Sequence, residues 1–210
     1  MGIGARVRSC FGPFEHVIAD VYRGFFFHVG TFARSVRDWF PEPKKILEIG
    51  CGEGSISEHL SRLYPQAQIV GIDIAANVGK LFKGDTTRVS FLRQTIQEFA
   101  PSHRQEFDLV LVCDVMHHVP WSMHDELLSE AKSTLKEGGG FVLKDWEWRR
   151  NLGLVLGYIS DRYITGDRVR FATGAELKKS IDDTFGPGCV EKEIRIRPWF
   201  NNLAFFVRNR

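Results

Sequence analysis

From residue 45 onward, short apolar runs alternate with stretches in which apolar residues recur at helical spacing. Continuous apolar runs of about four to eight residues, bounded by turn residues, are typical of strands buried on both faces. Such runs predict strands at residues 45–49, 68–72, 89–93, 107–113 and 140–144. Helical spacing predicts helices at residues 55–64, 76–82, 96–99 and 123–135. Strands that alternate with helices in this way predict a parallel α/β sheet.

The pattern changes in the last third of the chain. Residues 152–163 and 174–185 have helical spacing, so two helices are expected there. Two apolar or β-branched runs, 190–197 and 202–207, lie on either side of Pro198. These runs predict a final antiparallel pair of strands.

An aromatic-rich segment with helical spacing, residues 14–40, precedes the first strand. Pro41 and Pro43 separate it from the sheet, because proline ends a helix. We therefore expect a helical leader or lid at residues 1–44 and one α/β domain at residues 45–210.

Composition and charge narrow the class of protein. The chain has 210 residues, of which 43% are hydrophobic and 26% charged, with a net charge of +2, so nucleic acid is not an expected partner. Its cysteines, scattered without a C-x-x-C pair, argue against a zinc site or a disulfide framework. There is no transmembrane-length apolar run, and residues 1–14 lack a signal-peptide core. We expect a cytoplasmic protein that does not insert into a membrane.

A glycine-rich turn follows the first strand directly, at Gly50, Gly52 and Gly54. Glycines let a backbone turn tightly and approach a ligand, and the next helix would point its N–H groups at the same place. A dinucleotide-binding fingerprint, G-x-G-x-x-G, would need its third glycine at position 55, where the chain has Ser55. The turn therefore predicts a nucleotide-type cofactor other than a dinucleotide.

Glu48 precedes the first glycine by two residues, and the pattern E-x-G-x-G-x-G resembles the first motif of class I S-adenosylmethionine-dependent methyltransferases. Four later segments resemble this family in the same order: Asp73, Gln94-Thr-Ile96, Cys113-Asp-Val-Met-His-His-Val-Pro120 and Leu-Lys-Glu-Gly-Gly-Gly-Phe before the fifth strand. The resemblance implies a Rossmann-like α/β fold with helices on both faces of a seven-stranded, mostly parallel sheet. The last two strands would form an antiparallel hairpin.

The resemblance also implies S-adenosylmethionine as the cofactor, with S-adenosylhomocysteine as its product. Asp73 would accept hydrogen bonds from the ribose hydroxyls, and Ile74 would pack on the adenine. Thr95, at a position where the family often has aspartate, would meet the adenine edge. The other implied contacts are Glu48, Gly50, Cys51, Gly52, Gly54, Ile96, Cys113 and Asp114, with Tyr22 of the leader as a lid residue.

Three candidate catalytic residues follow the fourth and fifth strands: His117, His118 and Asp145. Methyl transfer to a hydroxyl needs a base, and histidine, with an ordinary pKa of about 6.5, suits that task. In the alternative, one histidine packs under the cofactor and the other caps the next helix. Asp145 would orient a histidine, contact the substrate, or merely cap a turn or helix. We expect no metal site.

Residues 146–172 are expected to face the substrate, and five arginines concentrate there: Arg149, Arg150, Arg162, Arg168 and Arg170. Arginine recognises carboxylates and phosphates with two parallel hydrogen bonds, which favours an anionic acceptor. In the alternative, these side chains form a solvated, salt-bridged surface.

We therefore expect methyl transfer to a small molecule, most simply to an oxygen atom. Nitrogen or carbon methylation is an alternative, as is a cofactor-binding partner subunit without activity. Nucleic-acid amino-methyltransferases carry Asp/Asn-Pro-Pro-Tyr/Phe after the fourth strand, where this chain has Cys113-Asp-Val-Met. Nothing specific favours a protein substrate, and the chain is expected to be a monomer or a homodimer.

Overall fold

A computed structural model of the chain describes residues 27–150, 152–159 and 169–210. They form a seven-stranded sheet with the strand order β3-β2-β1-β4-β5-β7-β6. The strands are β1 (Lys45–Ile49), β2 (Gln68–Asp73), β3 (Val89–Arg93), β4 (Phe107–Cys113), β5 (Leu135–Trp146), β6 (Val190–Ile196) and β7 (Asn202–Arg208). β1 to β5 are parallel, and β7 lies antiparallel between β5 and β6. The predicted fold class is confirmed.

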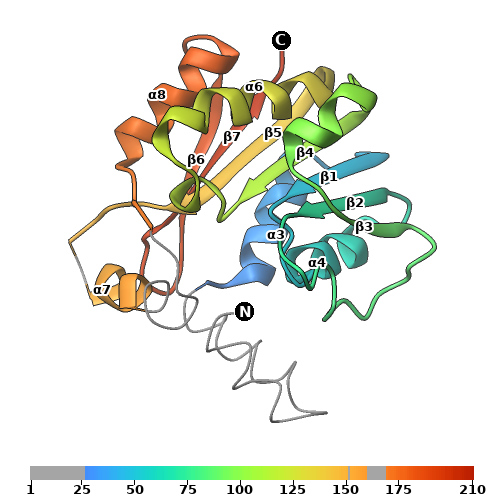
Figure 1. The fold of residues 1–210 in the computed structure, drawn as a ribbon, viewed down its shortest axis with the longest axis horizontal. Coiled ribbons are helices and arrows are strands. Elements are labelled where there is room, and N and C mark those ends of the chain that lie inside the picture. The colour runs from blue at the N-terminus through green and yellow to red at the C-terminus, as the bar shows by residue number, and fades with distance from the viewer. Residues whose placement is uncertain (1–26, 151, 160–168) are drawn as a thin grey trace.

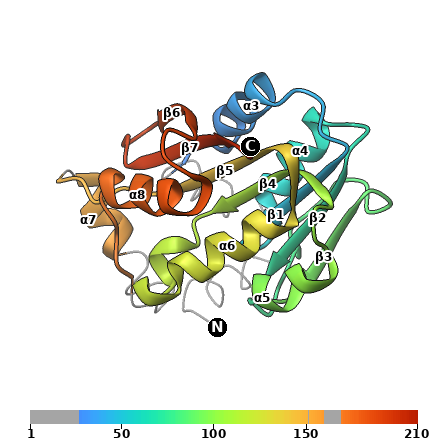
Figure 2. The same cartoon turned by 90° about the horizontal axis from the view of Figure 1, so that it is seen from above.

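Helices lie on both faces of the sheet, with α3 and α4 on one side and α6 and α8 on the other (Figures 1 and 2). The α-helices are α3 (Val29–Trp39), α4 (Ser55–Leu63), α5 (Ile96–Phe99), α6 (His124–Thr134), α7 (Leu152–Ile159) and α8 (Gly174–Phe185). Three short 3₁₀ turns are η2 (Ala100–Ser102), η3 (Met116–His118) and η4 (Trp121–Met123). α7 lies apart from the sheet, at one end of the molecule (Figure 1).

The central strand β4 explains how one sheet supports two hydrophobic cores. Successive side chains of a strand point to opposite faces. Leu109 and Leu111 pack in the core beneath α3 and α4, whereas Val110 and Val112 pack in the core beneath α6 and α8. Because both faces of β4 are covered, its residues from Leu109 to Cys113 form an uninterrupted apolar run.

The predicted helix at residues 76–82 is wrong, because the segment forms consecutive turns instead. Its backbone bonds to the glycine-rich turn: Gly79 N–H donates to the Gly52 carbonyl at 2.9 Å, and Leu81 N–H donates to the Glu53 carbonyl at 3.0 Å. Gly79 also has a positive φ of 67°, which interrupts a helix. A tertiary contact therefore replaces the hydrogen bonds that a local helix would make.

The fifth strand is longer than the predicted 140–144, because β5 spans Leu135–Trp146. It pairs with β4 on one edge and β7 on the other, and Asp145 lies opposite Leu203 of β7. Asp145 is thus part of a strand, and its Oδ2 accepts a hydrogen bond from the N–H of Met116, the first residue of η3, so the predicted capping role holds for that turn. Within the described residues, no helix has the length and apolar character needed to cross a bilayer.

The leader is described only from Phe27, and α3 forms its last part. Its predicted lid residue, Tyr22, lies outside the described residues. The helix predicted at 152–163 is α7 over its first eight residues, and the remainder of that prediction also lies outside the described part of the chain.

Candidate active site

The functional edge of the sheet follows from its topology. From β1 the chain adds β2 and β3 on one side, then returns to add β4 and β5 on the other. Ligands of such sheets bind outside the carboxyl ends of the strands, where the two directions diverge. Two groups of residues meet there: a glycine-loop half after β1 and β2 (Glu48 to Gly54, with Asp73), and a histidine half after β4 and at the end of β5 (Asp114 to His118, with Lys144 and Asp145).

Gly50 and Gly52 serve different purposes in the glycine-loop half. Both have a positive φ, 78° and 51°. A Cβ on Gly50 would lie 2.1 Å from Cγ2 of Val115, so glycine is needed for the loop to pack against the segment after β4. A Cβ on Gly52 would have no atom of the described residues within 4 Å. The backbone at Gly52 therefore borders open space that a ligand can approach.

Asp73 ties the glycine loop to the end of β2. Its Oδ2 accepts a hydrogen bond from Gly52 N–H at 2.8 Å, and its Oδ1 accepts one from Ala75 N–H at 2.8 Å. Each carboxylate oxygen has two lone pairs and so retains capacity for a further donor. Ile74 follows directly with its side chain 69% exposed, an unusual state for a large apolar residue. Asp73 thus lies directly beside the open space at Gly52, and Ile74 is the next residue along the chain.

Glu48 is fully buried beneath the glycine loop and only half satisfied. Its Oε2 accepts a hydrogen bond from the Ser57 hydroxyl, while its Oε1 has no partner among the described residues. Burial raises the pKa of Glu48 to about 8; the Ser57 hydrogen bond opposes this shift, and the charge of Asp73 adds to it. A buried acceptor without a partner is costly, so this oxygen fits a ligand that brings hydrogen-bond donors or positive charge.

Two of the predicted cofactor residues have other roles for their side chains. The Thr95 hydroxyl accepts from Glu98 N–H at 3.2 Å, and Thr95 N–H donates back to the Glu98 carboxylate at 2.8 Å, which caps α5. Ile96 is buried in the core beneath α6 and α8. Cys51 and Cys113 are buried thiols as expected, and burial raises the pKa of each. Cofactor contacts at these four residues stay predictions.

The histidine half is organised around a buried pair. His117 Nδ1 lies 2.5 Å from Asp145 Oδ1, and both side chains are almost fully buried. Asp145 also accepts hydrogen bonds from Met116 N–H at 2.8 Å and Trp146 N–H at 2.6 Å. Burial alone would raise the pKa of Asp145, but His117, Lys144 and the Trp146 N–H outweigh it and lower the pKa. The ionised carboxylate therefore accepts the Nδ1 proton, which makes Nε2 the basic nitrogen.

Sequence reasoning missed Lys144 as a site residue. Its side chain has no exposed surface, and its Nζ lies 2.6 Å from both carboxylate oxygens of Asp114. The ring of Phe27 lies 3.9 Å from the same Nζ. The one sequence signal is a charged Lys-Asp pair at the end of an apolar run. Buried charges need partners, so this pair could have indicated a charge cluster.

The neighbouring histidines differ from one another. His118 is exposed, with its ring centroid 4.1 Å from that of His117. The alternative in which a histidine caps the next helix is wrong for His118, because the N-cap residues of η4 and α6 are Pro120 and Met123. His124 has a structural role instead, with its Nε2 2.9 Å from the Met116 carbonyl.

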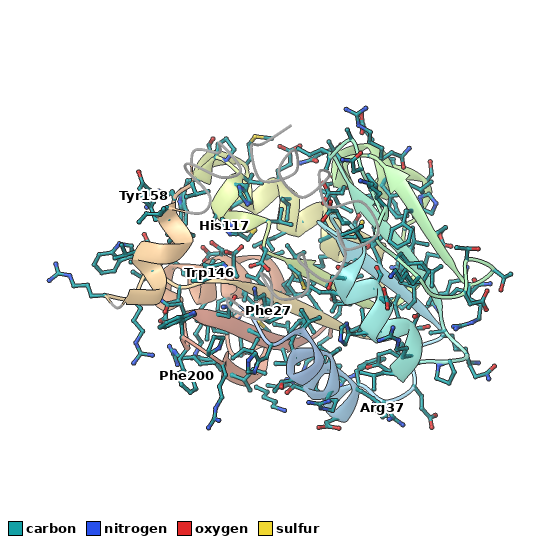
Figure 3. All side chains as sticks on the ribbon, turned by 90° about the horizontal axis from the view of Figure 1, so that it is seen from below. Phe27, Arg37, His117, Trp146, Tyr158 and Phe200 are labelled. Carbon is teal, nitrogen blue, oxygen red and sulfur yellow. The ribbon has the colours of Figure 1, made fainter. Side chains whose placement is uncertain are left out.

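Phe171 covers His117 from a distant part of the chain. Its ring centroid lies 5.4 Å from that of His117 and 6.1 Å from that of Trp146. Arg170 N–H donates to the His117 carbonyl at 3.0 Å. In Figure 3, His117 and Trp146 lie toward the middle of the molecule, whereas Tyr158 lies on α7 at its outer edge. Arg170 and Phe171 thus lie against His117.

The arginines of residues 146–172 do not converge in the part of the chain that the structure describes. The Arg170 guanidinium pairs with Glu176 at 3.2 Å and lies 4.6 Å from the ring centroid of Trp121. Arg150 lies 5.7 Å from the ring centroid of Trp148. Arg149 is exposed, and Arg162 and Arg168 lie outside the described residues.

Asp114, His117 and Asp145 each offer one metal-ligand atom, and these atoms lie within 4.8 Å of one another. However, the ammonium of Lys144 already contacts both oxygens of Asp114. Both oxygens of Asp145 accept hydrogen bonds from nearby donors. A metal ion would have to displace the lysine, so we assign this cluster to charge balance rather than to metal binding.

Comparison with known proteins bears on this site. A family model described as "Methyltransferase domain" matches residues 46–139, which include the glycine loop, Asp73 and His117. Residues 46–139 therefore form a methyltransferase domain of the class I S-adenosylmethionine-dependent type. The recognition of this family from its motifs is therefore confirmed.

Curated relatives match a longer part of the chain, at low sequence identity. The ubiquinone biosynthesis O-methyltransferase of Klebsiella pneumoniae is 28% identical over 152 residues, which cover 67% of this chain. The match spans only 61% of that relative's length. Its counterpart in Salmonella enteritidis matches to the same extent.

Solved structures extend the similarity of the fold. A 1,6-didemethyltoxoflavin-N1-methyltransferase from Burkholderia thailandensis, with bound 1,6-didemethyltoxoflavin and S-adenosylhomocysteine, superposes with a TM-score of 0.70 at 17% identity. The match covers 98% of this chain and 88% of that one. An S-adenosylmethionine-dependent methyltransferase from Archaeoglobus fulgidus gives a TM-score of 0.64 at 18% identity, with 89% and 96% covered. At these identities the superpositions establish the fold.

Proposed function

We propose that this methyltransferase transfers the methyl group of S-adenosylmethionine to a hydroxyl oxygen of a small molecule. The observation that carries the proposal is the buried pair of His117 and Asp145, 2.5 Å apart, at the carboxyl ends of the strands. The cofactor supplies a methyl group already activated as a sulfonium. The protein must therefore position both reactants and, for a hydroxyl, remove a proton.

The glycine-loop half has the features that such a cofactor needs. The backbone at Gly52 borders open space, Asp73 retains acceptor capacity for ribose hydroxyls, and Ile74 offers an exposed apolar surface for adenine. Oε1 of Glu48 would meet donors or positive charge at the methionine end. We retain the other predicted contacts in the proposal: Gly50, Cys51, Gly54, Thr95, Ile96, Cys113, Asp114 and Tyr22.

The histidine half would perform the proton transfer. The acceptor hydroxyl would donate its proton to Nε2 of His117 as the oxygen bonds to the methyl carbon. Asp145 would stabilise the resulting imidazolium through Nδ1, at the 2.5 Å contact. The imidazolium would then release the proton to solvent. His118, exposed beside His117, is the second candidate for this role.

The nature of the acceptor is the finer part of the proposal. The name of the Klebsiella pneumoniae relative refers to O-methylation, whereas the Burkholderia thailandensis structure is that of an N1-methyltransferase. The buried His117–Asp145 pair favours oxygen, because a hydroxyl keeps its proton at neutral pH and a neutral amine is already nucleophilic. An anionic group on the acceptor is a further hypothesis, and Arg170, next to Phe171 above His117, is its candidate contact.

The first experiment is calorimetric titration of the wild type with S-adenosylmethionine and S-adenosylhomocysteine. Binding should be lost in Asp73→Ala and kept in Asp85→Ala, an exposed aspartate on the loop before β3. Cofactor binding without product on any acceptor would indicate a non-catalytic partner subunit. No binding by the wild type would contradict the cofactor assignment.

The second experiment tests the base. A panel of phenols, carboxylic acids and amines is incubated with labelled cofactor, with wild type and His117→Gln. We expect methylated hydroxyl products and a rate loss of about 10²–10⁴ in the variant, with unchanged affinity for S-adenosylhomocysteine. Products on nitrogen alone, or a fully active variant, would contradict the proposed oxygen chemistry. Arg170→Ala should raise KM for carboxylate-bearing acceptors only.

A further inference from the structure

We infer that Lys144 is a positioning residue that keeps His117 unprotonated at neutral pH by balancing the charges of Asp114 and Asp145. The inference deepens the proposed function, since it concerns the availability of the base assigned above. It rests on the contacts of a lysine that the sequence motifs do not include. The experiment below does not depend on an acceptor.

The burial of Lys144 requires an explanation. The three preceding residues on β5 are apolar and pack in the two cores, and Lys144 has no exposed surface. Its ammonium is enclosed by Asp114, at 2.6 Å from both oxygens, and by the ring of Phe27, at 3.9 Å. A buried ion pair is often no more stabilising than apolar residues of the same size. A role in the site accounts for the lysine better than stability does.

The backbone of Asp114 supports its contact with the Lys144 ammonium. It follows β4 directly and has a positive φ of 56°, a conformation that aspartate tolerates better than most residues. Its N–H donates to the Lys144 carbonyl at 2.9 Å, so backbone and side chain both tie the two residues together. The ammonium is therefore held in one place, one residue along the strand from Asp145.

The net charge of the cluster formed by Asp114, Lys144, Asp145 and His117 depends on the protonation of His117. Asp114 and Asp145 are negative and Lys144 is positive, so the cluster carries one net negative charge while His117 is neutral. Protonation of His117 brings the cluster to neutrality. Without the ammonium, two negative charges would face the imidazole and hold a proton on it more strongly. Lys144 thus allows the cluster to accept a single proton and to release it again.

Other groups around His117 act less directly. His118 contacts it from the same turn, with the ring centroids 4.1 Å apart, but is exposed to solvent. Arg170 contacts it through a backbone N–H, and its guanidinium is paired with Glu176. Phe171 adds an uncharged ring. Among these described neighbours, Lys144 carries the fully buried cationic charge.

The test is a titration of the His117 imidazole by ¹⁵N NMR in the cofactor-free protein, assigned by comparison with His117→Gln. In Lys144→Met we expect the midpoint of the His117 titration to move up by on the order of one pH unit. In Asp114→Asn it should move down, because a negative charge is lost and the ammonium remains. Lys136→Met is the matched control: Lys136 lies on the same strand and pairs with Asp108 at 2.7 Å, far from His117.

Opposite shifts in the two variants and none in the control support the inference. No shift, or shifts of the same sign, would overturn it, because a merely structural role of Lys144 gives no charge-dependent sign. If Lys144→Met does not fold, Lys144→Gln replaces it, because the neutral amide removes the charge and keeps a hydrogen-bond donor for Asp114. If the midpoints shift as expected while His117→Gln remains active on the acceptor panel, the proposed function fails and the inference on Lys144 stands.

Discussion

Two fully buried carboxyl groups at the same edge of the sheet have pKa values that are shifted in opposite directions. The pKa of Glu48 rises to about 8, whereas that of Asp145 is lowered. Burial acts on both in the same sense. Asp145 has the His117 imidazole as a hydrogen-bond partner and the Lys144 ammonium nearby, while Glu48 has a single hydroxyl donor, Ser57, and the like charge of Asp73 nearby. The sign of each shift is therefore set by the partners and not by the depth of burial.

This contrast divides the site into halves with different chemistry. The glycine-loop half presents backbone groups and a carboxyl that is largely neutral, together with an unpartnered acceptor. In the histidine half, Lys144 balances the charge of Asp114, and Asp145 holds the His117 imidazole in a defined tautomer. Changes in the first half should affect cofactor binding, and changes in the second should affect the rate of methyl transfer. Four variants test this separation.

The largest effect is expected for Asp145→Asn. The amide cannot act as a full acceptor for the Nδ1 proton, so the tautomer and the basicity of His117 are both lost. We expect the rate of methyl transfer to fall about 10²–10⁴-fold, with unchanged affinity for S-adenosylhomocysteine. Asp108→Asn is the matched control, a carboxylate near the opposite end of β4 that pairs with Lys136. An equal loss of rate in both variants would show that the effect is not specific to the dyad.

A large effect on stability is expected from Glu48→Gln in the cofactor-free protein. Because its pKa rises from 4.5 to about 8 on folding, the wild type loses stability as pH increases through that window. The variant lacks this titration. Between pH 4.5 and pH 8.5 the free energy of unfolding of the wild type should therefore fall, relative to that of the variant, by on the order of 4 kcal/mol. Urea unfolding at a series of pH values measures the difference.

In the same experiment, the contribution of Asp145 to stability should depend on pH in the opposite direction to that of Glu48. Its pKa is lowered on folding, so its contribution to stability is present above its ordinary value of 3.8 and is lost as pH falls further. Parallel curves for the wild type and Glu48→Gln would contradict the contrast between the two carboxyl groups.

A smaller effect is expected for Asp73→Asn. The amide keeps one acceptor but loses the charge that strengthens hydrogen bonds to ribose hydroxyls, each worth about 1.5–3 kcal/mol. Affinity for S-adenosylhomocysteine should fall about 10- to 100-fold, as measured by calorimetry. The His117 titration should be unchanged, because Asp73 lies in the other half of the site. A shift of that titration would show that the halves are coupled.

The smallest effect is expected for Thr95→Ala. It removes the hydroxyl that caps α5, and loss of such a cap costs about 1 kcal/mol of stability. Thermal unfolding measures this change. Cofactor affinity decides the second question: a loss larger than threefold would show that Thr95 contacts the adenine as well as capping the helix, while no loss would restrict it to the cap.

The positions of the strands along the chain and most of their limits could be predicted, because each strand is a local apolar run bounded by turn residues. The helix predicted at 76–82 failed because its N–H groups bond to the glycine loop, a contact between segments distant in sequence. The site was predicted in part. His117 and Asp145 were named separately, but local patterns could not reveal that they bond to each other, nor that Lys144 points inward.

By itself, the sequence determined the α/β fold, the position of the glycine turn and the family, because these depend on periodicity and on residues with special backbone freedom. Only the tertiary structure decided which carboxyl group is neutral and which is ionised. Protonation depends on the distances among side chains from β1, β4 and β5, and on the exclusion of water between them. Those distances are set when the strands pair, since His117 and Asp145 are 28 residues apart along the chain.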